Sequence, residues 1–221
     1  MNVFQILYQY REDFLVGLTV TLKLCLLVWG IGLLFGFLLG YAGSKFKSAI
    51  GIPSRIFSFI LGGVPVLVFL FWLHYPVQYW LGVVIDGFYT AVTALAIINT
   101  FLVADIVRNA LNNFPAQYIL AGEVCGLSKN TIYRKIQLPI ILRQILPSIL
   151  FAQVAMLQST LFASLISVEE IFRVCQRINS SIYKPVEIYS ALAILFLLIC
   201  LPINGIGYWI KRKYTRDFSE T

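Results

Sequence analysis

Charged residues are scarce in this chain, and their scarcity excludes most classes of soluble protein. Only 12 % of the 221 residues are Asp, Glu, Lys or Arg, whereas 59 % are hydrophobic and the mean hydropathy is +0.84. An ordinary soluble domain carries about 25 % charged residues. The composition therefore indicates a membrane protein that crosses the bilayer several times and leaves no soluble domain of useful size.

Groups that carry chemistry are also rare. His74 is the single histidine, and the four cysteines include no Cys-x-x-Cys pair. No G-x-x-x-x-G-K-[ST] phosphate loop occurs, and the runs long enough to span a membrane hold no pair of acids. We expect no disulfide, no metal site, no bound cofactor and no intramembrane enzyme activity. His74, next to Tyr75 at a helix end, is interpreted as an interfacial residue rather than a proton relay.

Long apolar runs, by contrast, are abundant. A membrane-spanning helix needs about 20 predominantly apolar residues. Five segments qualify: 14–41, 54–75, 83–107, 139–161 and 186–210. We predict an all-α membrane protein with about five transmembrane helices in one domain, residues 1–221. Residues 2–12 are predicted to form a short amphipathic helix at the membrane interface.

The apolar segment 162–175 carries two acids, Glu169 and Glu170, and is predicted to be re-entrant or interfacial. We interpret both carboxylates as solvated. The alternative is that they line an outer vestibule or meet a binding protein.

The distribution of cations predicts the orientation of the chain. Lysine and arginine are frequent after the first and third spans and in the C-terminal tail, whereas the loop 76–82 has neither. Since cations favour the cytoplasmic side, the N-terminus is predicted to be outside and the C-terminus cytoplasmic. The cations flank spans instead of forming one stripe, so the net charge of +7 does not indicate nucleic-acid binding.

The polar segment 116–138, between the third and fourth spans, is predicted to be an elbow of two short helices on the cytoplasmic side. Gly126 suits the left-handed conformation that follows a helix, and Ser128 can cap the next helix. Pro139 is expected to end that helix, because proline pushes Leu138 out of the α region. A rigid, charged elbow indicates a docking surface for a soluble partner.

Gly32, Gly36 and Gly40 recur at four-residue spacing and therefore share one face of the first span. Small residues on a face let another helix approach closely. A packing seam within the chain is favoured over a dimerisation face.

Asp105 and Arg108 lie three residues apart at the inner end of the third span. At this spacing the two side chains can pair on one helix face. We favour an interfacial ion pair that orients the helix over a role in transport.

The elbow resembles a loop found in ABC importer permeases, whose pattern is E-A-A, three residues, Gly, nine residues, then I-x-L-P. Leu120-Ala121-Gly122 stand at the E-A-A positions, Gly126 matches the glycine, and Ile136-Gln137-Leu138-Pro139 match the end of the pattern. Further motifs are similar to the polar amino-acid branch of that family. Residues 17–24 resemble G-x-x-x-T-L-x-L, 62–68 R-G-T-P-L-L-V, 99–108 N-x-A-x-x-A-E-x-x-R, and 157–166 L-K-D-T-S-L-A-S-V-I.

The resemblance, which covers residues 14–213, implies a permease of the type I importer fold in a bacterial cytoplasmic (inner) membrane, surrounded by lipid. It implies two cytoplasmic ATPase subunits that bind ATP and Mg, a second permease subunit, and an extracytoplasmic substrate-binding protein. This chain would be non-catalytic. The alternative is a stand-alone channel or secondary carrier, which predicts charged groups at mid-span and needs no docking elbow.

The resemblance also implies two sets of site residues. The ATPase-coupling set is Leu120, Ala121, Gly122, Glu123, Val124, Gly126 and Leu127. The candidate substrate-pathway set is Gly63, Pro65, Asn99, Gln158, Ser159 and Thr160. For the second set, a helix kink at the glycine and proline and interhelical hydrogen bonding by the polar side chains are the structural alternatives.

Several charged positions of the family pattern are replaced here. Gly62 stands for an arginine, Gln158-Ser159 for Lys-Asp, and Leu120 for the glutamate of the elbow. Since a buried ion needs a partner, we favour a heterodimer whose other permease keeps the charged groups. The alternative is a weakly charged or differently bound substrate. Docking of the ATPase is expected to depend on apolar contacts from Leu120, Val124 and Leu127.

Overall fold

The structure, a computed structural model, describes residues 2–215, and within that range it is helical with no strand. The α-helices are α1 (Val3–Gln9), α2 (Arg11–Lys45), α3 (Ile52–Gly63), α4 (Val66–Trp72), α5 (Gln78–Leu81), α6 (Gly87–Asn112), α7 (Ala116–Val124), α8 (Lys129–Ile132), α9 (Leu138–Ser159), α10 (Ile171–Ile182) and α11 (Pro185–Thr215). Three π-helical turns, η1 (Lys47–Gly51), η2 (Leu73–Val77) and η3 (Tyr133–Gln137), and one 3-10 turn, η4 (Thr160–Ile166), connect them.

Four helical segments of the described chain are long and apolar enough to cross a bilayer: α2, α6, the continuous stretch Lys129–Ile166, and α11. A fifth span is formed if the bent pair Lys47–Gly63 and Val66–Leu81 is taken as one. The prediction of an all-α membrane protein with about five spans is confirmed.

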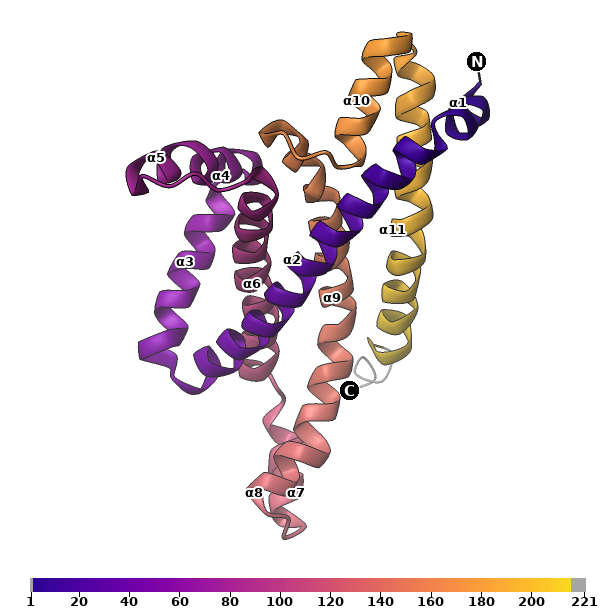
Figure 1. Cartoon of the computed structure of the whole chain (residues 1–221). Helices are drawn as coiled ribbons and strands as arrows, with labels where there is room; N and C mark the ends of the chain where they lie inside the picture. The colour runs from indigo at the N-terminus through magenta and orange to yellow at the C-terminus, as the bar shows by residue number, and fades with distance from the viewer. Residues whose placement is uncertain (1, 216–221) are drawn as a thin grey trace.

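The second span is not a straight rod, since its two halves meet at an angle of 101°. Val64 is extended (φ −101°, ψ 124°) because it precedes Pro65, and a residue before proline avoids the α region. After the bend, α4 and α5 run across the end of the molecule instead of continuing through it (Figure 1).

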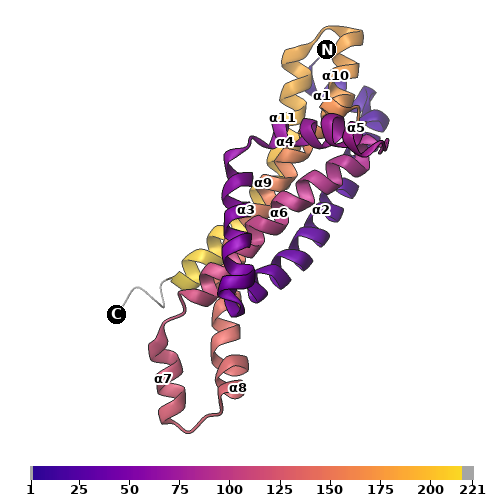
Figure 2. The same cartoon turned by 90° about the vertical axis from the view of Figure 1, so that its left-hand side faces the viewer.

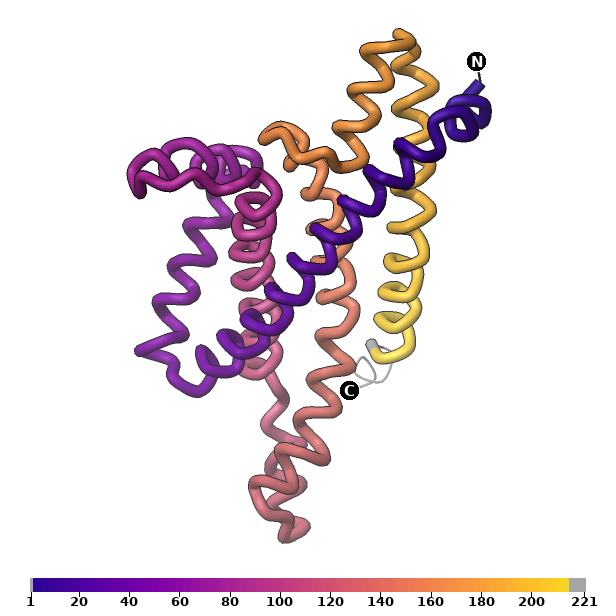
Figure 3. The backbone as a smooth tube through the Cα atoms, viewed as in Figure 1, coloured from indigo at the N-terminus to yellow at the C-terminus, as the bar shows by residue number. Residues whose placement is uncertain are grey.

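The long helices form one bundle. Figure 1 shows α6, α9 and α11 standing side by side, with α2 running obliquely across them. Figure 2 shows α7 and α8 projecting beyond the other helices at one end, while α1 and α10 lie at the opposite end. The tube in Figure 3 follows the chain from α2 through a tight turn into α3 at the elbow end.

The glycine face of α2 is a seam within the chain, as predicted. A Cβ atom on Gly32 would lie 2.3 Å from the Asn99 side chain, and one on Gly36 would lie 2.6 Å from Val103. A Cβ atom on Gly40 would lie 2.8 Å from a backbone oxygen of α6. The missing side chains therefore allow α2 and α6 to pack with their backbones close together, and this face is covered by α6.

The expectation that Pro139 ends the elbow helix is wrong. Leu138 is α-helical (φ −60°, ψ −48°), and the helix runs on into α9. The π turn η3 explains the outcome: the Leu138 amide donates to the carbonyl of Tyr133, five residues back. Pro139 thus lies in the first turn of α9, directly after the π turn and within the continuous helical stretch, where its missing N–H removes no regular α-helical hydrogen bond.

Within the segment 2–12, predicted to be one interfacial helix, the structure has the shorter helix α1, which lies against α11, and residues from Arg11 onward belong to α2. Ile6 is fully buried there, in a cluster that includes Ile188 and Ile178. The apolar face of α1 is therefore used for packing on the bundle.

Candidate functional site

The elbow is a compact, capped structure. Gly126 has a positive φ of 73°, and α7 ends in a Schellman motif: the Leu127 amide donates to the Gly122 carbonyl (3.0 Å) and the Gly126 amide to the Glu123 carbonyl (2.9 Å). The Ser128 hydroxyl accepts a hydrogen bond from the Thr131 amide (3.3 Å) at the start of α8. Both predicted caps are confirmed.

Gly122 allows the two helices of the elbow, α7 and α8, to pack closely together. It is buried, and a Cβ atom there would lie 2.8 Å from the side chain of Ile132, which is itself buried on α8. Of the seven residues predicted to couple to an ATPase, Gly122 is therefore the one that faces inward. The other six are exposed: Leu120, Ala121, Glu123, Val124, Gly126 and Leu127.

The outer face of the elbow carries exposed apolar side chains. Val124 is 89 % exposed, Leu120 58 % and Leu127 40 %. Exposed apolar side chains at a projecting tip mark an interaction surface. Because α8, η3 and α9 form one continuous helical stretch, the elbow is joined to the membrane-spanning part of the chain without an intervening loop.

Two of the six predicted pathway residues, Asn99 and Thr160, are fully buried inside the chain. Asn99 and Gln153 exchange side-chain hydrogen bonds of 3.0 and 3.1 Å, and Asn99 also donates to the Val28 carbonyl (3.2 Å). The Thr160 hydroxyl donates to the Leu157 carbonyl (2.7 Å). Asn99 thus ties α6 to α9 and α2, and the interhelical interpretation of this residue is favoured over pathway lining.

The Asn99→Leu substitution is expected to destabilise the folded chain, because it leaves the Gln153 amide buried without its partner. In a double-mutant cycle with Gln153→Leu, we expect a coupling energy of about 1 kcal/mol, the range found for side-chain hydrogen bonds between membrane helices. Unfolding of the full chain in detergent measures it. Thr93→Val, on an exposed part of α6, is the control; strictly additive effects at Asn99 and Gln153 would contradict the interpretation.

The other four pathway candidates lie on the surface. Gly63 and Pro65 are exposed at the bend of the second span, Gln158 is exposed, and Ser159 is half-buried with its hydroxyl bonded to a backbone carbonyl. The structure therefore places two of them at the bend between α3 and α4 and two at the end of α9.

Gln158 and Ser159 continue a polar stripe that the sequence analysis missed. Gln144 and Ser148 are also exposed on α9. At 3.6 residues per turn, residues 144, 148, 158 and 159 fall within about 100° of one another around the helix axis, with Phe151 and Ala155 between the two pairs. The signal for the first pair was the four-residue spacing of polar side chains in an apolar helix. The end of α11 flanks the first two of these residues, since Gln144 and Ser148 line a hollow of about 210 Å³ together with Lys211 and Tyr214.

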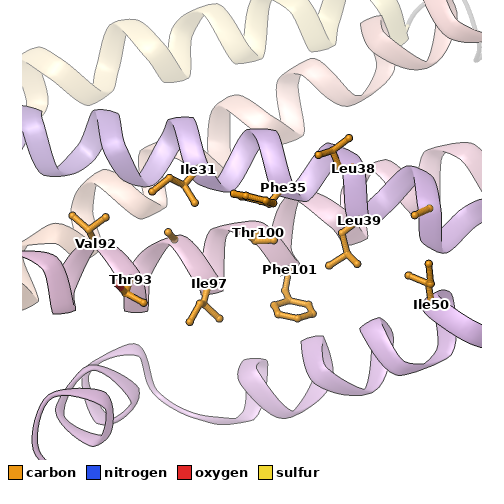
Figure 4. Close-up of a pocket in the computed structure, with 12 residues that line it drawn as sticks. Ile31, Phe35, Leu38, Leu39, Ile50, Val92, Thr93, Ile97, Thr100 and Phe101 are labelled. Carbon is orange, nitrogen blue, oxygen red and sulfur yellow. The ribbon is translucent and has the colours of Figure 1, made fainter. Parts of the chain in front are cut away.

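The hollow shown in Figure 4 does not suit an amino acid. It has a volume of about 610 Å³ and lies between α2, α6 and the turn η1. Figure 4 shows that Ile31, Phe35, Leu39, Ile97 and Phe101 point into it. The only polar side chains in its lining are Thr93 and Thr100, too few to compensate the ammonium and carboxylate of an amino acid.

The predicted pair of Asp105 and Arg108 is present at the elbow end of α6. Arg108 is 2 % exposed, and one of its terminal nitrogens bonds to Asp105 while the other donates to the Ser54 hydroxyl (2.7 Å). The Ser58 hydroxyl donates to the second Asp105 oxygen. The pair therefore fixes α3 to the end of α6, which agrees with an orienting role.

The interpretation of Glu170 as a solvated acid is wrong. Its side chain is buried and caps α10, with one oxygen accepting from the Arg173 amide and the other from the Phe172 amide, both at 2.9 Å. Glu169, by contrast, is exposed and pairs with Arg173 and Arg177. Sequence alone did not show that the start of α10 turns inward against α2, where the Ile171 amide also donates to the Thr21 hydroxyl.

Burial raises the pKa of the Glu170 carboxyl from 4.5 to about 7; the two amide hydrogen bonds oppose this shift, and the charge of Glu169 adds to it. The folded chain then binds this proton more tightly than the unfolded chain does. The contribution of this carboxyl to the free energy of unfolding is expected to be greatest below about pH 4.5, to fall between about pH 4.5 and 7, and to change no further above that. Thermal unfolding in detergent at several pH values measures this. Glu170→Gln should flatten the profile, and Glu169→Gln should leave it unchanged; an unchanged profile in Glu170→Gln would contradict the assignment.

Comparisons with known proteins agree with a membrane-spanning helical bundle that carries a projecting elbow. The family model described as "Binding-protein-dependent transport system inner membrane component" matches residues 32–216. The octopine transport system permease protein OccM of Rhizobium meliloti is 28 % identical over 216 residues, covering 91 % of this chain and 88 % of that protein. The glutamine transport system permease protein GlnP of Escherichia coli (strain K12) is 27 % identical over 198 residues, covering 89 % and 90 %.

Solved structures show the same architecture. A crystal structure of an amino acid ABC transporter with histidines contains a chain that superposes with a TM-score of 0.83 at 25 % identity, covering 95 % of this chain and 98 % of that one. An inward-facing MetNI methionine ABC transporter has a TM-score of 0.70 at 18 % identity, and it shares the fold.

Proposed function

This chain belongs to the family of binding-protein-dependent transport system inner membrane components, and from that membership we propose that it is the permease subunit of an ATP-driven importer for a polar amino acid or a related small solute. The observation that carries the proposal is the rigid elbow, whose exposed apolar face projects beyond the bundle and is continuous with a membrane-spanning helix. A channel or a secondary carrier has no need of such a part.

In the proposed mechanism, the elbow sits in a cleft of a cytoplasmic ATPase subunit. ATP and Mg bind to that partner, which hydrolyses the ATP, and this chain is non-catalytic. Closure of the ATPase pair moves the elbow, and the motion passes through η3 into α9 as a rigid displacement. Gln158, on the exposed face near the far end of α9, would then change its position relative to the opposing subunit, switching the path between inward- and outward-facing states.

The proposed path lies between this chain and a second permease. Gln144, Ser148 and Gln158 are exposed and Ser159 is half-buried, and none of these four side chains carries a charge. An amino acid needs an anion and a cation to match its charged ends. A heterodimer whose other permease supplies these groups is therefore favoured. A substrate-binding protein would meet the opposite end from the elbow, which is outside if the N-terminus is outside.

Co-purification of the full-length tagged chain from its native membrane tests the proposal. We expect an ATPase with a phosphate loop and a second, charge-retaining permease, identified by mass spectrometry. An ATPase with this chain alone would keep the importer and replace the heterodimer by a homodimer. If no ATPase is found even after mild crosslinking at the exposed Cys125, the importer proposal fails and a channel or carrier takes its place.

A further inference from the structure

Three cationic side chains surround a small hollow at the elbow end of the bundle. The hollow has a volume of about 290 Å³ and lies between the end of α2, the turn η1, the start of α3 and the end of α6. Lys47, Arg55 and Arg108 line it. The first two are exposed, whereas Arg108 is buried.

The Nε–H group of Arg108 is an unsatisfied hydrogen-bond donor within the described chain. Its two terminal nitrogens are engaged by Asp105 and Ser54, but its Nε atom is buried and has no hydrogen-bond partner within the described chain. An unsatisfied buried donor on a charged group costs free energy unless an acceptor is supplied. The lining of the hollow includes no carboxylate, and Asp105, which pairs with Arg108, balances only one of the three cations.

Two glycines help to keep the hollow open. A Cβ atom on Gly51 would lie 2.5 Å from the Gly43 carbonyl oxygen, so α2 and η1 meet backbone to backbone. A Cβ atom on Gly43 would already touch the Arg108 side chain at 3.5 Å. Larger side chains at either position would occupy the space beside the guanidinium.

We propose that this hollow binds a phosphate-bearing anion, with Lys47 and Arg55 as its donors and the buried guanidinium of Arg108 as a third positive charge in its wall. Phosphate oxygens accept charge-assisted hydrogen bonds from arginine and lysine. Basic pockets between membrane helices on the cytoplasmic side suit anionic lipid headgroups. Both the headgroup of an anionic phospholipid and free inorganic phosphate offer this chemistry.

The position of the hollow suits a headgroup. It lies at the turn from α2 to α3, while the elbow continues further outward (Figure 1). Phe46 and Ile52 are exposed on the same turn, 52 % and 57 % respectively. Apolar side chains beside cations are typical of the boundary between hydrocarbon and headgroups. This inference requires only that the chain lies in a membrane, so it stands or falls separately from the proposed transport function.

Native mass spectrometry of the purified full-length chain in detergent tests the site. Phosphatidylglycerol, phosphatidylcholine and inorganic phosphate are added separately, and bound species are counted. We expect the wild type to retain phosphatidylglycerol in preference to phosphatidylcholine. The double variant Lys47→Gln/Arg55→Gln is expected to bind phosphatidylglycerol about tenfold more weakly, since each surface cation near an anionic lipid contributes to binding. Both side chains are exposed, so folding should be preserved.

The matched control is Lys129→Gln/Arg212→Gln, which removes the same charge from exposed residues at the elbow end but outside the hollow. Loss of lipid binding only in the first double variant supports a headgroup site. Binding of phosphate without preference for phosphatidylglycerol, lost in the same variant, supports a site for the soluble anion. Equal losses in both double variants, or no binding of either anion, would overturn the proposal.

Discussion

The Gly36→Leu substitution is expected to prevent α2 from docking on α6 and so to abolish the folded chain in the membrane. A Cβ atom at this position would already lie 2.6 Å from Val103 and 2.9 Å from the Thr100 carbonyl oxygen. Since one contact is with backbone, no rotamer change can relieve it. Overpacking of a core typically costs about 1–3 kcal/mol, and a leucine at a backbone contact is expected to exceed that range.

Gly30→Leu is the matched control, because Gly30 lies on the same helix and a Cβ atom there meets nothing within 4 Å. The two variants have the same composition and the same helix propensity. The yield of monodisperse chain in detergent and its midpoint of thermal unfolding measure the difference. Equal yields and midpoints would show that the seam is not needed for folding. Gly36→Ala is expected to be intermediate.

The Val124→Asp substitution is expected to remove the chain's association with its ATPase, and with it ATP-driven uptake, without loss of stability. Val124 is 89 % exposed at the tip of the elbow, so a carboxylate there is solvated in the free chain. In a docked complex the same charge would be desolvated in an apolar contact. Loss of a central interface residue costs about 2 kcal/mol or more, which corresponds to roughly a 30-fold loss of affinity.

Co-purification stoichiometry and uptake in proteoliposomes give the two readouts, and thermal unfolding confirms that the variant is folded. Val84→Asp is the control: Val84 is 99 % exposed in the loop before α6, at the end opposite the elbow. It should leave ATPase association unchanged. Full association in Val124→Asp would remove the elbow face from the docking surface.

Much of the fold was predictable because it follows from local rules. The apolar runs are long enough to cross a bilayer as helices. In lipid, the backbone N–H and C=O groups of such a run must bond to one another, so each run forms a membrane-spanning helix. The elbow caps at Gly126 and Ser128 were predictable for the same reason, since a left-handed glycine and a capping hydroxyl act within a few residues of the chain. The glycine seam of α2 was predictable because small residues at four-residue spacing let another helix approach closely.

The tertiary structure decided how the polar residues are used. Asn99 is buried and links two helices because Gln153, 54 residues later, hydrogen-bonds to it across the bundle. Glu170 is a buried N-cap because α10 folds back against α2. Pro139 was placed inside a continuous helix by a π turn that local rules do not predict. Sequence determined which segments are helical and apolar, since those properties belong to each segment alone. Which polar groups are satisfied inside and which remain exposed on α9 depended on segments far apart in the chain, so only their packing could decide it.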